Sequence, residues 1–253
     1  HVWCADNLDH TVRKFTSSGE LLMTLGEADQ PADTGFILGE TPVQYAGGPF
    51  NMVTNVAVAE DGELFISDGY GNARVHRFSA DGKLLASWGG PGNGPGQFNL
   101  PHGIVVDRSG RVLVADRENS RIQFFSKDGA YLYSWDWVNR PDDLFLDEQE
   151  NLYIAELGWN IPFSHRPEFR LMDHPPMGHA PIARVTICDL DGNIQTQLGG
   201  ADSLLPGNFI VPHGIWADSC GDFYVGEVIK ASGSIDHFAP LTCHAFQKFI
   251  RAG

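Results

Sequence analysis

The chain has 253 residues, a formal net charge of −15 and a pI of about 4.9. This acidic balance argues against a nucleic-acid partner, because phosphate binding needs a basic face. No apolar run approaches the roughly 18 residues of a membrane span, so none is predicted. The four cysteines show no CxxC spacing, which argues against a Cys-rich zinc site and leaves open one or two disulfides or four buried thiols (Cys4, Cys188, Cys220 and Cys243).

One unit of four short β-type runs repeats along the chain. Its clearest copy extends from Pro101 to Trp135, with turn-forming breaks such as Arg108-Ser109-Gly110. In every copy the second run ends in an acidic residue, and these residues are Asp6, Asp68, Asp116, Glu156 and Glu227. Four antiparallel strands in about 40 residues are the size of one propeller blade. The sequence therefore predicts an all-β fold, a β-propeller of four-stranded blades.

The predicted blades form a single domain over residues 1–253. Taken in chain order they are a partial blade at 1–26, whole blades at 50–89, 97–136 and 138–199, and a partial blade at 209–250. The first lacks its opening strand and the last lacks its fourth strand. Because propellers usually close without an open sheet edge, we expect a segment upstream of His1 that supplies the missing strand and one more blade, making six.

Three loops interrupt the repeat, at 27–50, 157–182 and 228–242. Long loops inside a compact repeat are usually functional or disordered. The loop at 157–182 is rich in Pro and His and follows the second strand of its blade. Two interpretations stay open for it: a surface excursion that caps strand ends, or a wall of an active site.

The opening strands carry the candidate catalytic and binding residues. Blades three and five begin Pro101-His102-Gly103 and Pro212-His213-Gly214, while Thr54 and Asp142 hold the same phase in blades two and four. The opening strand lies innermost, so these side chains point to one level of the channel, where we expect Thr54 and Asp142 to contact a substrate.

Alternate blades of a six-bladed ring stand about 120° apart. A third His at the same phase, upstream of His1, would therefore complete a tripod with His102 and His213. Three His with an open fourth position are typical of catalytic zinc. Alternatively, Pro-His-Gly is only a repeat consensus in which the His caps a strand by hydrogen bonding.

Two further residues lie at the same end of the predicted ring. Tyr70 follows the second strand of blade two, and Gly69 and Gly71 on either side of it predict a poorly packed phenol that is free to reach inward. A Tyr near a metal acts as a general base if its pKa is lowered. Arg117 follows the second strand of blade three and is suited to hold a carboxylate through two hydrogen bonds. The alternatives are a turn aromatic that covers the sheet end, for Tyr70, and an ion pair with Asp116 or Glu118, for Arg117.

With these residues in place, the chain resembles the NHL-repeat propellers and, within them, the peptidyl-α-hydroxyglycine α-amidating lyases and their bacterial relatives. The resemblance is carried by Asp68-Gly69-Tyr70-Gly71-Asn72, by Ala115-Asp116-Arg117-Glu118-Asn119 and by the two Pro-His-Gly strands. It is close from about 51 to 136, returns at 209–227 and is weak in 157–182. A generic NHL repeat lacks this combination.

The resemblance implies a six-bladed propeller with an axial zinc on three His, often with a structural calcium. His102 and His213 would be zinc ligands, Tyr70 the base that takes the substrate hydroxyl proton, and Arg117 the group that binds the substrate carboxylate. Such enzymes cleave the N–C bond of a peptidyl-α-hydroxyglycine, which gives a peptide amide and glyoxylate. Gly214 departs from the family, which tends to have an acidic residue tied to calcium there.

The predicted function is therefore a zinc-dependent carbon–nitrogen lyase that acts on a small-molecule or peptide substrate, in a secreted or periplasmic protein. One alternative is a non-catalytic secreted propeller that binds a partner through its loops. Another is a lactonase of the gluconolactonase type, although such propellers usually place acidic and Asn ligands at the axis, where this chain has His, Thr and Asp.

Overall fold

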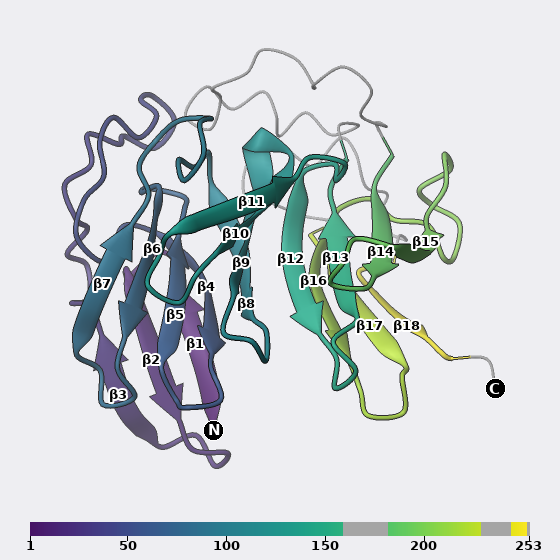
Figure 1. Cartoon of the computed structure of the whole chain (residues 1–253), viewed down its shortest axis with the longest axis horizontal. Helices are drawn as coiled ribbons and strands as arrows, with labels where there is room; N and C mark the ends of the chain where they lie inside the picture. The colour runs from purple at the N-terminus through teal and green to yellow at the C-terminus, as the bar shows by residue number, and fades with distance from the viewer. Residues whose placement is uncertain (159–181, 229–243, 252–253) are drawn as a thin grey trace.

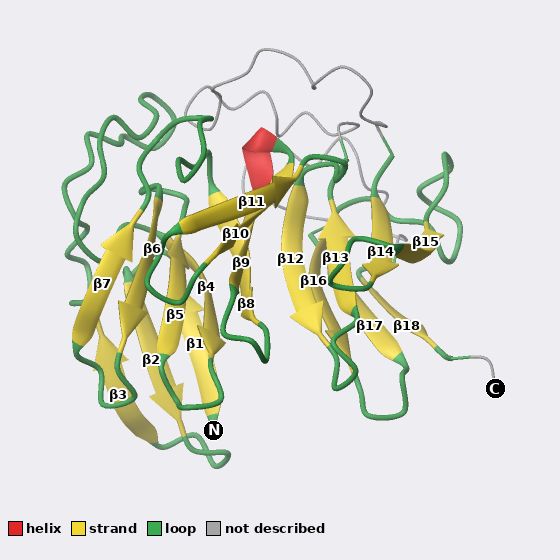
Figure 2. Ribbon diagram, in the orientation of Figure 1, coloured by secondary structure: helices red, strands yellow, loops and turns green. Residues whose placement is uncertain are grey.

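A computed structural model describes residues 1–158, 182–228 and 244–251. These residues form antiparallel sheets that stand side by side in chain order (Figure 1). The one helical element among them is the short 3-10 turn η1 (Arg117–Asn119), drawn red in Figure 2. No helix in the described ranges is long and apolar enough to cross a membrane. The all-β, propeller fold class is thus confirmed.

Each sheet is a meander in which consecutive strands pair. The two outer sheets have three described strands: β1 (Val2–Asp6), β2 (Thr11–Phe15) and β3 (Leu21–Leu25) in the first, and β16 (Pro212–Ala217), β17 (Phe223–Glu227) and β18 (Phe246–Phe249) in the last. The three sheets between them have four strands each. They are β4 (Val53–Val58), β5 (Leu64–Asp68), β6 (Arg74–Phe78) and β7 (Leu84–Trp88); β8 (Pro101–Val106), β9 (Val112–Asp116), β10 (Arg121–Phe125) and β11 (Tyr131–Trp135); and β12 (Pro141–Leu146), β13 (Leu152–Glu156), β14 (Arg184–Cys188) and β15 (Ile194–Leu198).

The core lies between successive sheets. Each of four apolar clusters takes side chains from two neighbouring blades; one of them joins Phe65 and Val75 to Ile104 and Val114. Full burial of such a side chain contributes about 1.5–3 kcal/mol. This packing brings the opening strands together, so that β8 lies between β4 and β12, and β12 lies between β8 and β16.

The repeated acidic residue has a structural role. The carboxylate at the end of the second strand accepts a hydrogen bond from a main-chain N–H just before the opening strand of the same blade. The pairs are Asp68 with Asn51 (3.0 Å), Asp116 with Asn99 (2.7 Å), Glu156 with Asn139 (2.5 Å) and Glu227 with Ile210 (2.6 Å). Charge-assisted bonds of this kind are strong, and they fix the entry of each opening strand into the channel.

All four described opening strands carry a register shift at the same point. The shifts lie between Val53 and Asn55, Pro101 and Ile104, Pro141 and Asp143, and Pro212 and Gly214. A β-bulge re-aims a side chain. Thr54, His102, Asp142 and His213 occupy these bulges, so the backbone irregularity coincides with the predicted site residues.

Candidate metal and substrate site

The two Pro-His-Gly strands place their histidines in contact. His102 on β8 and His213 on β16 have ring centroids 4.8 Å apart and lie almost perpendicular to each other. His102 is 4% exposed, whereas the side chain of His213 is 35% exposed. The structure therefore brings the two predicted metal ligands to one place, with β12 between their strands.

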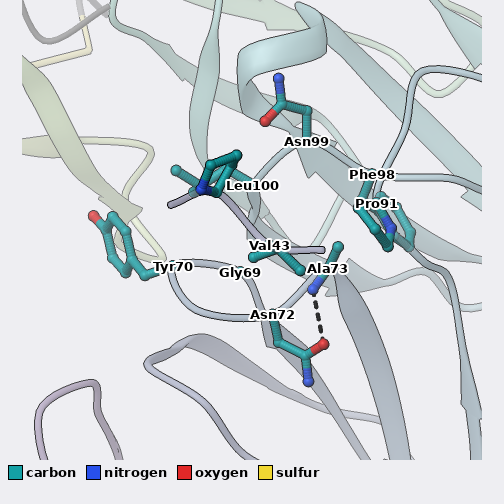
Figure 3. A pocket seen from close by; sticks show the side chains of 10 residues that line it. Val43, Gly69, Tyr70, Asn72, Ala73, Pro91, Phe98, Asn99 and Leu100 are labelled. Carbon is teal, nitrogen blue, oxygen red and sulfur yellow. Dashed lines mark hydrogen bonds between the residues drawn. The ribbon is translucent and has the colours of Figure 1, made fainter. Parts of the chain in front are cut away.

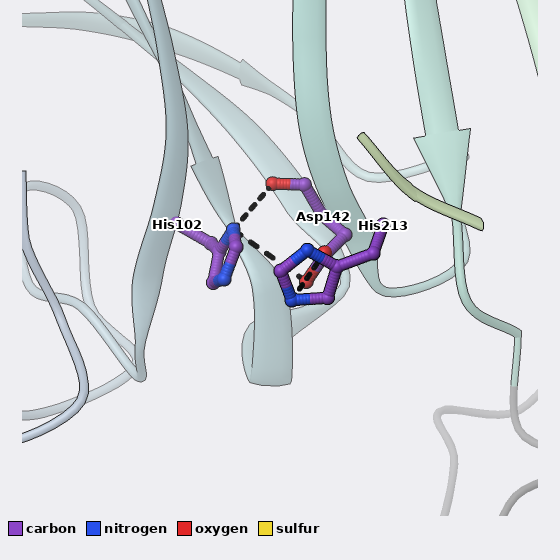
Figure 4. A group of neighbouring side chains, drawn as sticks. All are labelled: His102, Asp142 and His213. Carbon is purple, nitrogen blue, oxygen red and sulfur yellow. Dashed lines mark hydrogen bonds and ion pairs between the residues drawn. The ribbon is translucent and has the colours of Figure 1, made fainter. Parts of the chain in front are cut away.

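Asp142 on β12 joins the two histidines (Figure 4). Its Oδ2 lies 3.3 Å from Nε2 of His213, and its Oδ1 lies 3.6 Å from Nδ1 of His102. One ligand atom from each of the three residues lies within 4.8 Å of the others. Asp142 is fully buried, and among the described residues its Oδ2 has no hydrogen-bond donor. A buried carboxylate oxygen without a donor is costly unless a cation satisfies it.

The ring of His102 is held in one tautomer. Its Nδ1 is 2.9 Å from the main-chain oxygen of Asp142, so Nδ1 carries the proton and donates it to that carbonyl. Nε2 then has the free lone pair, which is the usual arrangement of a metal-binding imidazole. Burial lowers the pKa of His102 to about 3, against the opposing charge of Asp142. The ring is therefore neutral at pH 7, as metal binding requires.

Tyr70 faces the same nitrogen. Its hydroxyl donates to Nε2 of His102 at 3.0 Å, and the two rings meet edge to face with centroids 5.4 Å apart. The flanking glycines permit close backbone approach: a Cβ at Gly69 would lie 2.0 Å from the Pro101 carbonyl oxygen, and one at Gly71 2.1 Å from Oδ1 of Asn51. Tyr70 is therefore held against β8, not left loosely packed between two flexible residues.

The protonation of Tyr70 is set by opposing effects. Burial raises the pKa of its phenol, while the charge of Arg117 and a hydrogen bond from Arg117 lower it, and the net shift is upward. Without a further positive charge the phenol thus keeps its proton. The lowered pKa that a Tyr base needs would have to come from a bound cation.

Arg117 makes both a contact within its blade and a contact across blades. Its Nε donates to Oε1 of Glu118 at 2.9 Å, which is one of the ion pairs considered as an alternative role. Its Nη1 donates to Oδ1 of Asp142 at 3.0 Å, and its guanidinium lies 5.5 Å from the Tyr70 ring centroid. Burial alone would lower the pKa of Arg117, but the charges of Glu118 and Asp142 raise it. Arg117 is thus a buried cation at the edge of the histidine pair.

Thr54 has a different environment from the other bulge residues. Its hydroxyl lies 2.9 Å from the main-chain oxygen of Ser67 and 2.8 Å from that of Pro101. These contacts tie β4 to β5 and to the residue before His102. The predicted substrate contact of Thr54 stays a prediction.

A small pocket adjoins Tyr70 between blades two and three (Figure 3). It encloses about 310 Å³, including space open to solvent. Its lining is mostly apolar and includes Val43, Phe98 and Leu100, with Asn72 and Asn99 as polar members.

Sequence reasoning named Glu118 only as an ion-pair partner of Arg117, and it missed Arg140. Both are buried, and Glu118 lies between the guanidinium groups of Arg117 and Arg140. Sequence reasoning also placed Asp142 on the substrate and not beside the histidines. Its phase, shared with His102 and His213, was the signal that could have indicated a ligand.

The comparisons with known proteins agree with this geometry. The sequence profile of the NHL repeat matches residues 98–125. Together with the sheets, this defines the class: the chain is a β-propeller protein with an NHL repeat, and the predicted resemblance is confirmed.

Two named proteins are similar to the chain in sequence. The chain is 31% identical to human NHL repeat-containing protein 3 over 255 residues, which covers 96% of this chain and 64% of the relative. It is 33% identical to peptidyl-alpha-hydroxyglycine alpha-amidating lyase 1 of Drosophila melanogaster over 191 residues, or 69% of this chain and 32% of the relative. The chain thus spans less than two thirds of either relative.

Solved structures support the fold alone. A catalytically inactive virginiamycin B lyase from Staphylococcus aureus, in complex with quinupristin, superposes with a TM-score of 0.55 at 14% identity. That match covers 98% of this chain and 65% of the lyase. A protein of unknown function from Bacteroides caccae also gives a TM-score of 0.55, at 12% identity, over 87% of this chain and 64% of its own.

Proposed function

We propose that the protein is a metal-dependent carbon–nitrogen lyase of the amidating type, which cleaves a peptidyl-α-hydroxyglycine or a related carbinolamine. The observation that carries the proposal is the hydrogen bond from the Tyr70 hydroxyl to Nε2 of His102, which lies beside Arg117 and the His213–Asp142 pair. It is supported by the 33% identity to the Drosophila amidating lyase over 69% of the chain.

The residues present suit a divalent metal ion, and we infer zinc. His102 supplies a neutral imidazole, His213 supplies a second imidazole, and Asp142 supplies a buried oxygen without a donor among the described residues. Nitrogen and carboxylate ligands with an open position are typical of catalytic zinc. When bound, such an ion would polarise the substrate hydroxyl oxygen.

The side chains around that position account for the rest of the reaction. Arg117 would bind and orient the substrate carboxylate, and its charge would favour the phenolate of Tyr70. The Tyr70 oxygen would take the proton from the substrate hydroxyl. The electron pair left on that oxygen forms the aldehyde C=O as the C–N bond breaks, and Tyr70 returns the proton to the leaving amide nitrogen. The products are a peptide amide and glyoxylate.

Turnover of a peptidyl-α-hydroxyglycine tests the proposal. The zinc-loaded protein should release glyoxylate and peptide amide in equal amounts, well above the rate in buffer. Release at the buffer rate, from protein that carries zinc, would rule the lyase out. We also propose that the natural substrate belongs to this class of compound and that the protein is secreted or periplasmic.

A non-catalytic propeller is the second candidate. It is favoured by the contacts of Arg117, whose guanidinium already bonds two carboxylates. In that case the charged cluster would be structural. Substituting it would then change stability but no activity.

A further inference from the structure

A buried charged cluster connects the candidate site to the start of blade four. Arg140 is fully buried and donates two hydrogen bonds to Glu118, from Nη2 to Oε1 at 2.8 Å and from Nε to Oε2 at 3.1 Å. The same Oε1 accepts Nε of Arg117 at 2.9 Å. One carboxylate is therefore shared by two arginines, and Arg117 also bonds Asp142.

The backbone at Arg140 does not explain its guanidinium. Arg140 has φ +49° and is equivalent to Met52 (φ +56°) and Leu100 (φ +65°) in the two preceding blades. In each case the residue's carbonyl oxygen accepts an N–H from the segment after the second strand: Arg140 from Leu157, Met52 from Tyr70 and Leu100 from Arg117. Met and Leu perform this role without a charge. The Arg140 guanidinium therefore serves another purpose, besides the hydrogen bond from its Nη1 to the main-chain oxygen of Gly158 at 3.1 Å.

That purpose follows from the charges. Burial disfavours the ionised carboxylate of Glu118 and would raise its pKa, but the charges of Arg140 and Arg117 outweigh burial and lower it. Among the described residues these two arginines are the hydrogen-bond partners of the Glu118 carboxylate. Without Arg140, the whole negative charge of Glu118 would fall on Arg117 and favour a two-bonded pair that turns Arg117 away from Asp142.

We propose that Arg140 is a positioning residue: it balances the charge of Glu118, so that Arg117 remains directed at Asp142, where it binds the carboxylate of the substrate. This rests on the proposed function only in taking a carboxylate as the group that Arg117 binds. It adds a residue of blade four that acts on Arg117 through Glu118.

The chain itself offers a matched substitution. Arg140→Met places in blade four the residue that blade two has at the equivalent position with φ +56°. The double variant Glu118→Gln/Arg140→Met then removes the negative charge as well. Loss of one partner of a buried ion pair is harmful, while loss of both is often tolerated.

The experiment uses zinc-loaded protein and two readouts: KM and kcat with a peptidyl-α-hydroxyglycine, and binding of glyoxylate by calorimetry, which needs no turnover. Arg140→Met should keep its zinc. Its KM and its Kd for glyoxylate should both rise, on the order of tenfold, with a smaller change in kcat. The double variant should restore both toward wild type.

The outcomes separate the two proposals. If wild type binds glyoxylate without lyase turnover, and Arg140→Met loses that binding while the double variant regains it, the lyase function is wrong and the role of Arg140 stands. If Arg140→Met retains wild-type KM and glyoxylate binding, or if the double variant is as impaired as the single one, Arg140 does not position Arg117. A purely structural role would lower the unfolding temperature of Arg140→Met without a selective change in KM.

Discussion

Blades three and five begin with the same tetrapeptide, Pro-His-Gly-Ile, and with the same bulge, yet their histidines have different surroundings. His102 is buried between blades two and four, with both ring nitrogens hydrogen-bonded. His213 is half-buried, and its Nε2 lies beside Asp142. The motif therefore sets where the imidazole stands, and the neighbouring blades set its chemistry.

The largest effect on metal affinity is expected when one of the two histidines is removed. His102→Ala and His213→Ala each remove an imidazole from the pair, so metal affinity should fall by more than the roughly 10–100-fold that loss of an outer partner costs. Chelator competition measures this. The bond from Nδ1 of His102 to Asp142 preorganises that ring, so His102→Ala should weaken metal binding more than His213→Ala. Wild-type metal affinity in both variants would mean that neither ring binds metal.

Tyr70→Phe tests a contact that distinguishes His102 from His213, because the Tyr70 hydroxyl bonds to His102. The variant keeps the edge-to-face ring contact and loses the hydroxyl. If Tyr70 is the base, kcat should fall by about 10²–10⁴-fold while zinc content stays at the wild-type level. Retained turnover would remove Tyr70 from the reaction.

Asp142→Asn tests the residue that the two histidines share. The amide oxygen can still accept the hydrogen bond of Arg117, but the negative charge is lost. We expect zinc to bind roughly 10–100-fold more weakly, with kcat reduced in proportion to the unloaded fraction. Unaltered zinc affinity would assign Asp142 to the substrate or to Arg117 alone.

Thr54→Val gives the smallest effect. The hydroxyl of Thr54 ties β4 to the residue before His102, so its loss should cost about 1 kcal/mol of unfolding free energy. Urea unfolding measures it. Zinc affinity should stay within twofold of wild type, and a large loss of substrate affinity would instead support the predicted substrate contact.

Local features explain what the sequence could predict. The acidic residue after each second strand recurs because it binds the backbone that enters the opening strand, so the period of the blades is visible in the sequence. The phase of His102 and His213 is likewise local, since both occupy the bulge. For this reason the blades and the histidine pair could be predicted from spacing alone.

Contacts between blades could not be predicted in this way. The Glu118–Arg140 pair joins residues 22 positions apart in the sequence, and nothing in either segment specifies the other. The glycines beside Tyr70 were interpreted as sources of freedom, whereas they allow close approach to Pro101 and Asn51. Such features depend on how one sheet packs on the next, which the repeat pattern does not encode.

X-ray absorption at the zinc edge of the loaded protein tests the central claim most directly. The account predicts one tightly bound zinc per chain with two imidazole nitrogens and a carboxylate oxygen at about 2.0–2.2 Å, and loss of one imidazole from that spectrum in His213→Ala. A chain that binds no zinc, or a bound zinc whose spectrum contains no imidazole and is the same in His213→Ala, would contradict it.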